Sequence, residues 1–255
     1  MAQLVEPLDF VNMMTYDFHG AWESNSNHQS ALYQNPNDPN AIPGANYTYT
    51  TDSAIQYLLE RNVPSRKIVV GLPFYGRGWQ AAKTDIYATV LDTNAAPLWD
   101  CNDIQPDYID ADGVYHVTGD EISPLFAEVG RTYGQIGEPD MNSIHFMNEG
   151  ASGVYDYWKL MELYETKDAI LIYDDIAQAS LLCVNENIDK LYSFDIPAVT
   201  EVKMQYITDM SLGGAMFWSI DGDADNDSTN ANRNHGDQLL DIIARNLNIS
   251  NTPTY

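Results

Sequence analysis

Three short stretches of the chain combine aromatic side chains with charged or polar ones. They cover residues 16–23 (YDFHGAWE), 75–79 (YGRGW) and 218–221 (WSID). Tyr and Trp offer flat apolar faces with a polar rim, and such faces suit sugar rings. The chain holds 17 Tyr and 5 Trp against only 12 Lys and Arg. Many of these Tyr fit ordinary half-buried strand positions, so it is their grouping in three places that favours a binding site.

Each stretch lies at the end of an apolar run that predicts a strand, or shortly after it. These runs cover residues 10–16, 67–72 and 215–220, and they are nearly continuous in apolar side chains, as expected of strands buried on both faces of a parallel sheet. In α/β barrels the loops at the carboxyl ends of the strands build the site. For the first stretch the simpler alternative is a strand that ends in a capping Asp and a surface aromatic.

The segments between these strands predict helices and one long loop. Helices are expected over residues 51–63, 195–212 and 237–247, with the first capped by Thr51-Asp52-Ser53 and the second started by Pro197. Residues 17–49 are rich in Asn and Pro and show no periodicity. A loop of that length is unusual and tends to be functional or disordered.

Residues 80–194 do not alternate strand with helix and predict a compact α+β insertion. Strand character appears at residues 115–118 and 169–173, and residues 153–163 begin extended and turn into a helix. The expected domains are therefore 1–79 with 195–255, and 80–194. Because a complete eight-unit barrel needs roughly 250 residues without insertions, three strand–helix units indicate only part of a barrel.

Composition excludes several functions. With 12 basic and 37 acidic residues the net charge is −25, which argues against nucleic acid and anionic membrane surfaces. No apolar run is long enough to span a membrane, and the first residues lack the basic region and apolar core of a signal peptide. Cys101 and Cys183 have no metal spacing; each is a buried thiol, or the two pair. We expect no metal and no cofactor.

The three stretches, in this order, resemble the C-terminal half of family 18 glycoside hydrolases of the chitinase type. Residues 14–22 (MTYDFHGAW) are similar to the family's sixth barrel strand and its loop, residues 71–79 (GLPFYGRGW) to the seventh, and residues 213–221 (GGAMFWSID) to the eighth. Residues 148–157 and 173–179 resemble the chitinase insertion domain. The resemblance implies an α/β fold: the last three units of a (β/α)8 TIM barrel with an inserted α+β domain.

One motif of that family is absent from the chain. The family's acid is the Glu that ends an Asp-x-x-Asp-x-Asp-x-Glu pattern on the fourth strand. One acidic run, DGDADND at residues 221–227, lies after the last expected strand and is followed by Ser228 rather than by a Glu. It also fails as an EF-hand, since Asn226 and Asn232 replace the required Gly and Glu. The resemblance therefore implies a second polypeptide that carries strands one to five and the acid.

The resemblance also implies roles for individual residues. Family 18 enzymes cleave chitin, the β-1,4-linked polymer of N-acetylglucosamine, by a retaining mechanism in which the substrate's acetamido oxygen is the nucleophile. Tyr16 would hydrogen-bond that oxygen, and Asp17 would help to keep the acid Glu protonated. The expected substrate-binding residues are Met14, Trp22, Tyr75, Arg77, Trp79, Glu149 and Trp218.

Some of these residues have simpler alternatives. Trp218 would form the floor under the reacting sugar, whereas Arg77 could only pair with a carboxylate and Trp79 could only pack between barrel and insertion. We expect His19 and His28 to shape the loop rather than to react.

Three functions are consistent with these patterns. The first is a split or truncated chitinase that acts on chitin or chito-oligosaccharides outside the cell. The second is a non-catalytic chitin-binding or structural subunit of a larger, possibly toxin-like, assembly. The third is an endo-acting glycosidase on N-glycans, which the large insertion argues against because such a domain deepens a groove for long polymers.

Overall fold

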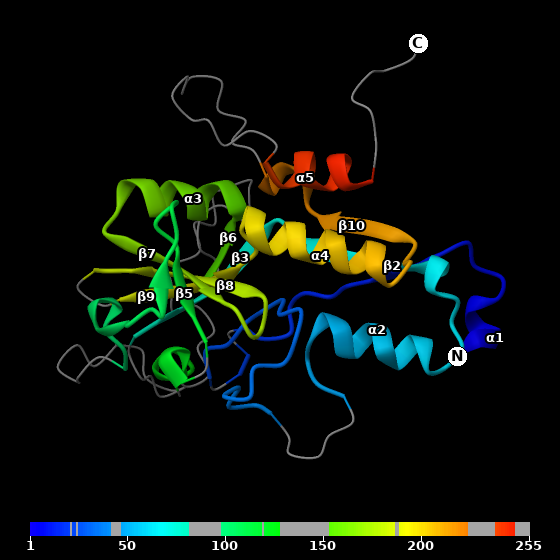
Figure 1. Cartoon of the computed structure of the whole chain (residues 1–255), viewed down its shortest axis with the longest axis horizontal. Coiled ribbons are helices and arrows are strands. Elements are labelled where there is room, and N and C mark those ends of the chain that lie inside the picture. Colours follow the sequence, from blue (N-terminus) through cyan, green and yellow to red (C-terminus); the bar gives the residue numbers. More distant parts are fainter. Residues whose placement is uncertain are drawn as a thin grey trace, which may run out of the picture.

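The fold is built on two β-sheets that lie toward opposite ends of the long axis (Figure 1). The computed structural model describes residues 1–20, 22–23, 25–41, 47–81, 98–118, 120–127, 153–186, 189–223 and 238–247. One sheet has three strands and the other has seven. Mixed α/β content is thus established, as predicted.

The three-stranded sheet is parallel throughout. It has the order β1 (Val11–Met13), β2 (Ile68–Pro73), β10 (Gly214–Trp218). β2 is the central strand, because Val11 pairs with Ile68 on one side and Gly214 pairs with Val69 on the other. The sheet brings together the three strands that the sequence predicts.

Helices flank these strands along the chain, and two of them lie between one strand and the next, as parallel strands require. They are α1 (Ala2–Val5), α2 (Thr51–Leu59), α4 (Pro197–Asp209) and α5 (Gln238–Asn246), with short 3-10 turns η1 (Ser65–Lys67) and η5 (Ile220–Gly222). In Figure 1, α5 lies above β10, α4 overlaps β2, and α2 lies below them. Pro197 is the first residue of α4, as predicted. The α2 cap is Thr50, one residue before the predicted one, and its hydroxyl accepts from Ser53 N at 3.2 Å.

The seven-stranded sheet is mainly antiparallel. Its order is β4 (Tyr108–Ile109), β5 (Tyr115–Val117), β7 (Ala169–Asp174), β8 (Ala179–Val184), β9 (Lys190–Phe194), β3 (Tyr75–Gln80), β6 (Val154–Asp156). β6 leads into α3 (Tyr157–Thr166), so the predicted change from extended chain to helix is confirmed. Two 3-10 turns, η2 (Cys101–Asp103) and η3 (Asp120–Leu125), lie between β3 and β6 in the chain.

β3 occupies residues that the sequence predicts as a functional loop at the end of the barrel part. It pairs with β6 and β9 in the seven-stranded sheet. The strand β2 of the three-stranded sheet thus ends at Pro73 and β3 of the seven-stranded sheet begins at Tyr75, both inside the expected domain of residues 1–79. The two glycines of the Tyr75–Trp79 stretch made a strand hard to recognise, because Gly is depleted in strands.

The strand β8, inside the seven-stranded sheet, is covered on both faces. On β8, Leu181 and Cys183 belong to one hydrophobic core and Leu182 and Val184 to the other. This alternation follows from the two-residue period of a strand. The core on the second face continues to the helices around the three-stranded sheet.

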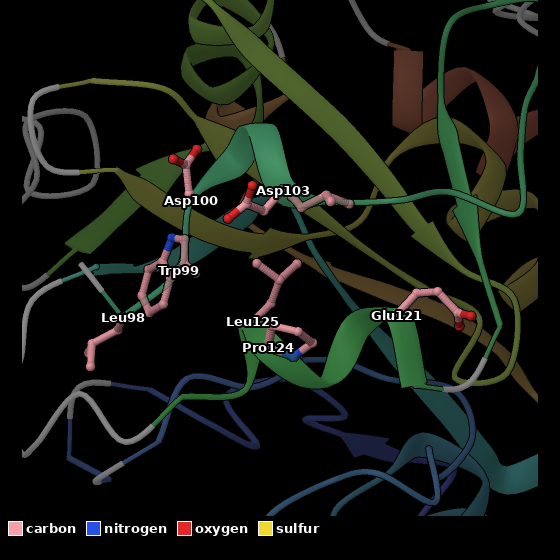
Figure 2. A pocket seen from close by; sticks show the side chains of 8 residues that line it. Leu98, Trp99, Asp100, Asp103, Glu121, Pro124 and Leu125 are labelled. Atoms are coloured by element: carbon pink, nitrogen blue, oxygen red, sulfur yellow. The ribbon is translucent and has the colours of Figure 1, made fainter. Parts of the chain in front are cut away.

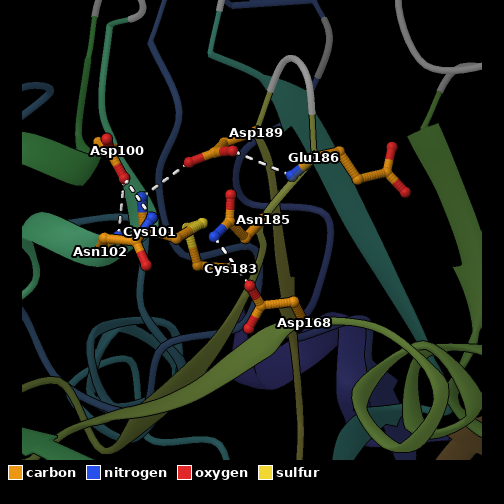
Figure 3. The surroundings of a disulfide bond; sticks show 8 residues. All are labelled: Asp100, Cys101, Asn102, Asp168, Cys183, Asn185, Glu186 and Asp189. Atoms are coloured by element: carbon orange, nitrogen blue, oxygen red, sulfur yellow. Dashed lines mark hydrogen bonds between the residues drawn. A yellow bond between two sulfur atoms is a disulfide. The ribbon is translucent and has the colours of Figure 1, made fainter.

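A disulfide fastens the other core. Cys101 and Cys183 are bonded, their Cα atoms lie 5.7 Å apart, and both residues are buried. Asp189 accepts from the Cys101 backbone N–H at 2.7 Å beside the bond (Figure 3). The sequence left pairing open, and the structure shows that the two cysteines pair. Closing a loop between residues 82 positions apart stabilises the fold by about 4 kcal/mol in a chain-entropy account.

The three-stranded sheet differs from prediction in its burial. β2 is buried at Ile68, Val70 and Leu72, as expected. No residue of β1 or β10 is buried, and Trp218 at the end of β10 is 57% exposed. The prediction that the outer strands are buried on both faces is wrong for this chain, because β1 and β10 are edge strands within the described residues. No helix in the described ranges combines the length and apolar character needed to cross a membrane.

Candidate active site

Tyr16 and Asp17 lie just beyond the end of β1, next to β2. The Thr15 hydroxyl donates to Gly71 O at 2.8 Å and accepts from Gly71 N at 3.0 Å, so it continues the pairing of β1 with β2. A Cβ on Gly71 would lie 2.4 Å from the Met13 carbonyl oxygen, so this approach requires glycine. Asp17 then turns with φ of 59°, in the left-handed region that non-glycine residues rarely adopt.

The Asp17 carboxylate joins the ends of two sheets. Its Oδ1 accepts from Arg77 Nε at 2.7 Å and from the Tyr75 hydroxyl. Arg77 also lies over the ring of Trp22, 4.6 Å from its centroid. Burial, reinforced by the charge of Asp17, raises the pKa of Tyr75 well above its ordinary range, so this phenol stays a proton donor. The predicted site residues Trp22, Tyr75 and Arg77 thus converge on Asp17.

Tyr16 is buried in the same cluster. Its ring meets Tyr75 edge to face, with centroids 6.0 Å apart, and packs with Val154. Its hydroxyl lies 3.8 Å from Met216 Sδ. Burial first, and then the charge of Asp17, raise the pKa of Tyr16, so it too is held as a donor. Two phenols and a guanidinium beside one carboxylate can hold a carbonyl or hydroxyl oxygen.

Two predicted residues present apolar surface near these strand ends. Met14 follows β1 and is 72% exposed. Trp218 ends β10 opposite Pro73, and its carbonyl accepts from Phe74 N at 2.8 Å. An exposed indole at this position offers a face for stacking on a sugar ring.

Asp156 is a site neighbour that the sequence reasoning missed. It lies directly opposite Tyr75 in the β3–β6 ladder and is only 3% exposed. Burial, with the charge of Asp221 adding to it, raises the pKa of Asp156 to about 7. Its place in the strand Val154–Asp156 was the available signal, since directly opposed residues in an antiparallel ladder point to the same face.

Two predicted substrate-binding residues do not join the cluster. Trp79 is fully buried in the core that also holds Trp99 and Cys183. The expectation that it stacks on a sugar is therefore corrected, because a side chain with no exposed surface offers no face to a ligand. Glu149 lies outside the described residues.

The two loop histidines have structural partners, in agreement with prediction. His19 Nδ1 lies 2.6 Å from Glu23 Oε2, and His28 Nε2 lies 2.9 Å from Asp174 Oδ2. Asp223, from the acidic run, accepts from the backbone N–H groups of Leu239 and Leu240 at the start of α5. These groups thus hold backbone and loops in place.

Among the described residues, hollows and one group of possible metal ligands also occur away from this cluster. A pocket of about 370 Å³ lies beside η2 and η3, where Trp99, Asp103 and Leu125 face one another (Figure 2). It is lined by none of the predicted site residues. Among the described residues, the group of possible metal ligands is Cys101, Cys183 and Asp189. Its two sulfurs form the disulfide, so they offer no thiolate to a metal.

Comparisons with known proteins show the family to which the chain belongs. The family model for glycosyl hydrolases family 18 matches residues 1–223. The chain is 31% identical over 227 residues to Chitinase A of Pseudoalteromonas piscicida, covering 85% of this chain and 24% of that protein. It is 30% identical over 242 residues to Chitinase B of Serratia marcescens, covering 88% of this chain and 42% of that protein.

A solved structure shows the same relationship. Chitinase ChiA74 from Bacillus thuringiensis aligns with a TM-score of 0.64 and 30% identity, over 99% of this chain and 34% of that one. The chain thus spans less than half the length of these relatives. Because the family model matches most of its residues, this chain belongs to family 18 of the glycosyl hydrolases.

Proposed function

We propose that this chain is the C-terminal portion of a chitinase that hydrolyses β-1,4-linked N-acetylglucosamine polymers with retention of configuration. The observation that carries the proposal is the convergence of Tyr16, Asp17, Tyr75 and Arg77 at neighbouring strand ends in a family 18 chain. Two buried phenols kept protonated, next to a paired carboxylate, suit the binding and polarisation of an acetamide.

In the proposed reaction the acetamido oxygen of the substrate attacks its own anomeric carbon while the acid Glu protonates the glycosidic oxygen, so that the bond to the leaving sugar breaks. Water then attacks the same carbon, returns a proton to the Glu and releases the acetamide. The Tyr16 hydroxyl donates to that oxygen, and Asp17 raises the pKa of the acid Glu by its negative charge. Arg77 and Tyr75 hold Asp17 in place. Trp218 lies under the reacting sugar, with Met14 beside it and Trp22 at a neighbouring unit.

The rest of the barrel is proposed to come from residues outside these 255. In the described structure β1 and β10 pair with β2 only. Apolar side chains around them are exposed, including Phe10, Met14, Trp218 and Ile220. Unpaired strand edges and exposed apolar side chains favour association with further strands. We propose that strands one to five and the acid Glu come from a missing N-terminal half or from a second polypeptide, and that the described strands are the sixth to eighth. Residues 80–194 are then the insertion domain, with β3 added to its sheet.

The disulfide bears on location. Disulfides persist in oxidising compartments and are rare in the cytosol of most organisms. The buried Cys101–Cys183 bond therefore supports action outside the cell, where chitin would be met.

A second candidate function follows from the missing acid. The 255 residues contain no Asp-x-x-Asp-x-Asp-x-Glu pattern, so the chain could serve as a chitin-binding or structural subunit of a larger assembly. The two functions are distinguished by the residue at the acid position of the polypeptide that would complete the barrel. A Glu there favours hydrolysis, and a substituted residue favours binding alone.

The test is Tyr16→Phe in the assembled barrel. The variant keeps the ring and removes only the donor, so kcat on chito-oligosaccharides should fall by about 100-fold or more while binding persists. Trp218→Ala should instead weaken binding. Unchanged turnover by Tyr16→Phe would remove Tyr16 from the mechanism. If the assembled wild type binds chitin without cleaving it, chitin binding remains as the function.

A further inference from the structure

Three consecutive buried polar residues connect the loop after β1 to the rest of the protein. His28 Nε2 meets Asp174, at the end of β7, and the Ser30 hydroxyl donates to Asp195 Oδ1 at 2.6 Å, just after β9. Gln29 lies between them and is completely buried. Of the three, Gln29 makes the contacts that lead to the candidate active site.

Gln29 uses the donors and acceptors of both its side-chain and its backbone amide. Its side-chain Nε2 donates to Tyr75 O at 2.7 Å, and its backbone N–H donates to the Ser193 hydroxyl at 2.9 Å. Its side-chain Oε1 accepts a longer contact of 3.4 Å from Asp17 N, and its backbone carbonyl accepts from Phe18 N at 2.9 Å. The side-chain carboxamide therefore lies between the residues that follow β1 and the first residue of β3.

These contacts bear directly on the backbone of Asp17. The N–H groups of Asp17 and Phe18 belong to the two peptide units that flank the Asp17 Cα, and Gln29 accepts from both. A left-handed conformation at a non-glycine residue persists only where its surroundings hold it. With φ at 59° the Asp17 carboxylate reaches Arg77 Nε and the Tyr75 hydroxyl.

We propose that Gln29 is a positioning residue of the active site. Its carboxamide holds the Asp17 turn and the Tyr75 carbonyl at a fixed separation, so that the Asp17 carboxylate meets Arg77 and Tyr75. A carboxamide fits because it donates and accepts at once. Leucine of similar size does neither, and a carboxyl group donates only when it is protonated. The expected effect on turnover rests on the proposed chitinase function, whereas the effect on Asp17 does not.

The kinetic test compares Gln29→Leu with a matched control in the assembled enzyme. Because small misplacements of catalytic groups are costly, kcat on chito-oligosaccharides should fall by about 100-fold with little change in KM. Ser30→Ala removes a buried hydrogen bond from the adjacent residue, so it should lower the melting temperature and leave kcat unchanged. Equal kcat values for the two variants, after normalisation to folded protein, would overturn the proposal.

The pH dependence of kcat in Gln29→Glu distinguishes a positioning role of Gln29 from a purely structural one. The carboxyl group introduced by this substitution can donate to Tyr75 O when it is protonated, and it cannot donate when it is ionised. The ratio of variant to wild-type kcat should therefore rise as the pH is lowered, while the ratio for Ser30→Ala stays flat. A ratio independent of pH would contradict the assigned donor role.

Crystal structures of the Gln29→Leu and Gln29→Glu variants test the proposal without turnover. The 2.7 Å contact between Arg77 Nε and Asp17 Oδ1 should be lost in Gln29→Leu, and Asp17 should leave the left-handed region. If wild type does not cleave chitin but this contact is lost, the proposed function fails and the role of Gln29 stands. If the contact and the Asp17 turn survive in both variants, the role of Gln29 is refuted whatever the activity.

Discussion

The two sheets of this protein differ in how completely they are covered. Every residue of β8 in the seven-stranded sheet is buried, whereas no residue of β10 in the three-stranded sheet is. The seven-stranded sheet has a core on each face and a disulfide. The three-stranded sheet has a covered central strand and two open sides. This difference supports the proposal that further strands cover the two edges of the three-stranded sheet.

The candidate active site lies where the two sheets meet. Asp17 follows β1 of the three-stranded sheet, and its partners Tyr75 and Arg77 belong to β3 of the seven-stranded sheet. The seven-stranded sheet therefore supplies two partners to a residue that follows a strand of the three-stranded sheet. Such support matters because a productive site needs side chains held within a fraction of an ångström.

The largest expected effect comes from removing the disulfide beside the seven-stranded sheet. Cys101→Ser with Cys183→Ser removes the cross-link between residues 82 positions apart and should lower the free energy of unfolding of this region by about 4 kcal/mol. Chemical denaturation monitored by Trp fluorescence measures it. A loss under about 1 kcal/mol would show that the two cores suffice without the bond.

A matched pair of phenylalanines compares the sheets directly. Phe194 on β9 is buried, and Phe217 on β10 is half-buried with its ring stacked on Phe74 at 4.9 Å. Phe194→Ala should cost about 4 kcal/mol, and Phe217→Ala about half as much or less. Urea denaturation of the chain alone provides both values. Equal losses would mean that β10 is already in a finished core.

The buried carboxyl group of Asp156 should make the free energy of unfolding depend on pH. Burial and Asp221 raise its pKa to about 7, above the usual value near 3.9, so the folded state favours the protonated form. This contribution to stability is complete below about pH 4 and is lost as the pH rises through 7. Asp156→Asn should therefore gain roughly 4 kcal/mol of stability relative to wild type as the pH rises from about 4 to about 8. Parallel thermal melts across this range test it, and a constant difference would contradict the raised pKa.

The smallest effect concerns the open edge. Met14→Ser alters a side chain that is 72% exposed, so the chain alone should change by less than about 0.5 kcal/mol. The same substitution should weaken association with the polypeptide that supplies the remaining strands. Asp9→Ser, at another exposed residue before β1, is the control. Equal association of both variants would argue against docking at this edge.

Many of the helices and strands could be predicted from the sequence, because local sequence signals mark where they begin and which residues they bury. Pro197 marks the start of α4, and the β-branched run of β2 is buried as expected. The open edges could not be predicted from periodicity, since an apolar strand reads the same whether or not a neighbour covers it. The fully buried Trp79 shows the reverse case, where a residue in a functional motif serves the core.

The site was predicted in part, for a similar reason. Tyr16, Asp17, Tyr75 and Arg77 stand at strand ends, where sequence patterns are informative. Gln29 lies in an aperiodic polar loop, and nothing around it in the sequence indicates that it is fully buried. Its partners are set by the tertiary fold. The disulfide likewise depends on strands and turns far apart in the chain.

Hydrogen–deuterium exchange tests the central claim most directly, that the three-stranded sheet is the open part of a barrel completed by other strands. In the chain alone, amides of β1 and β10 should exchange much faster than those of β8 and β9. Adding the polypeptide that carries the remaining strands should slow exchange in β1 and β10 and leave β8 and β9 unchanged. If β10 is as protected as β8 in the chain alone, or gains no protection in the assembly, the account is contradicted.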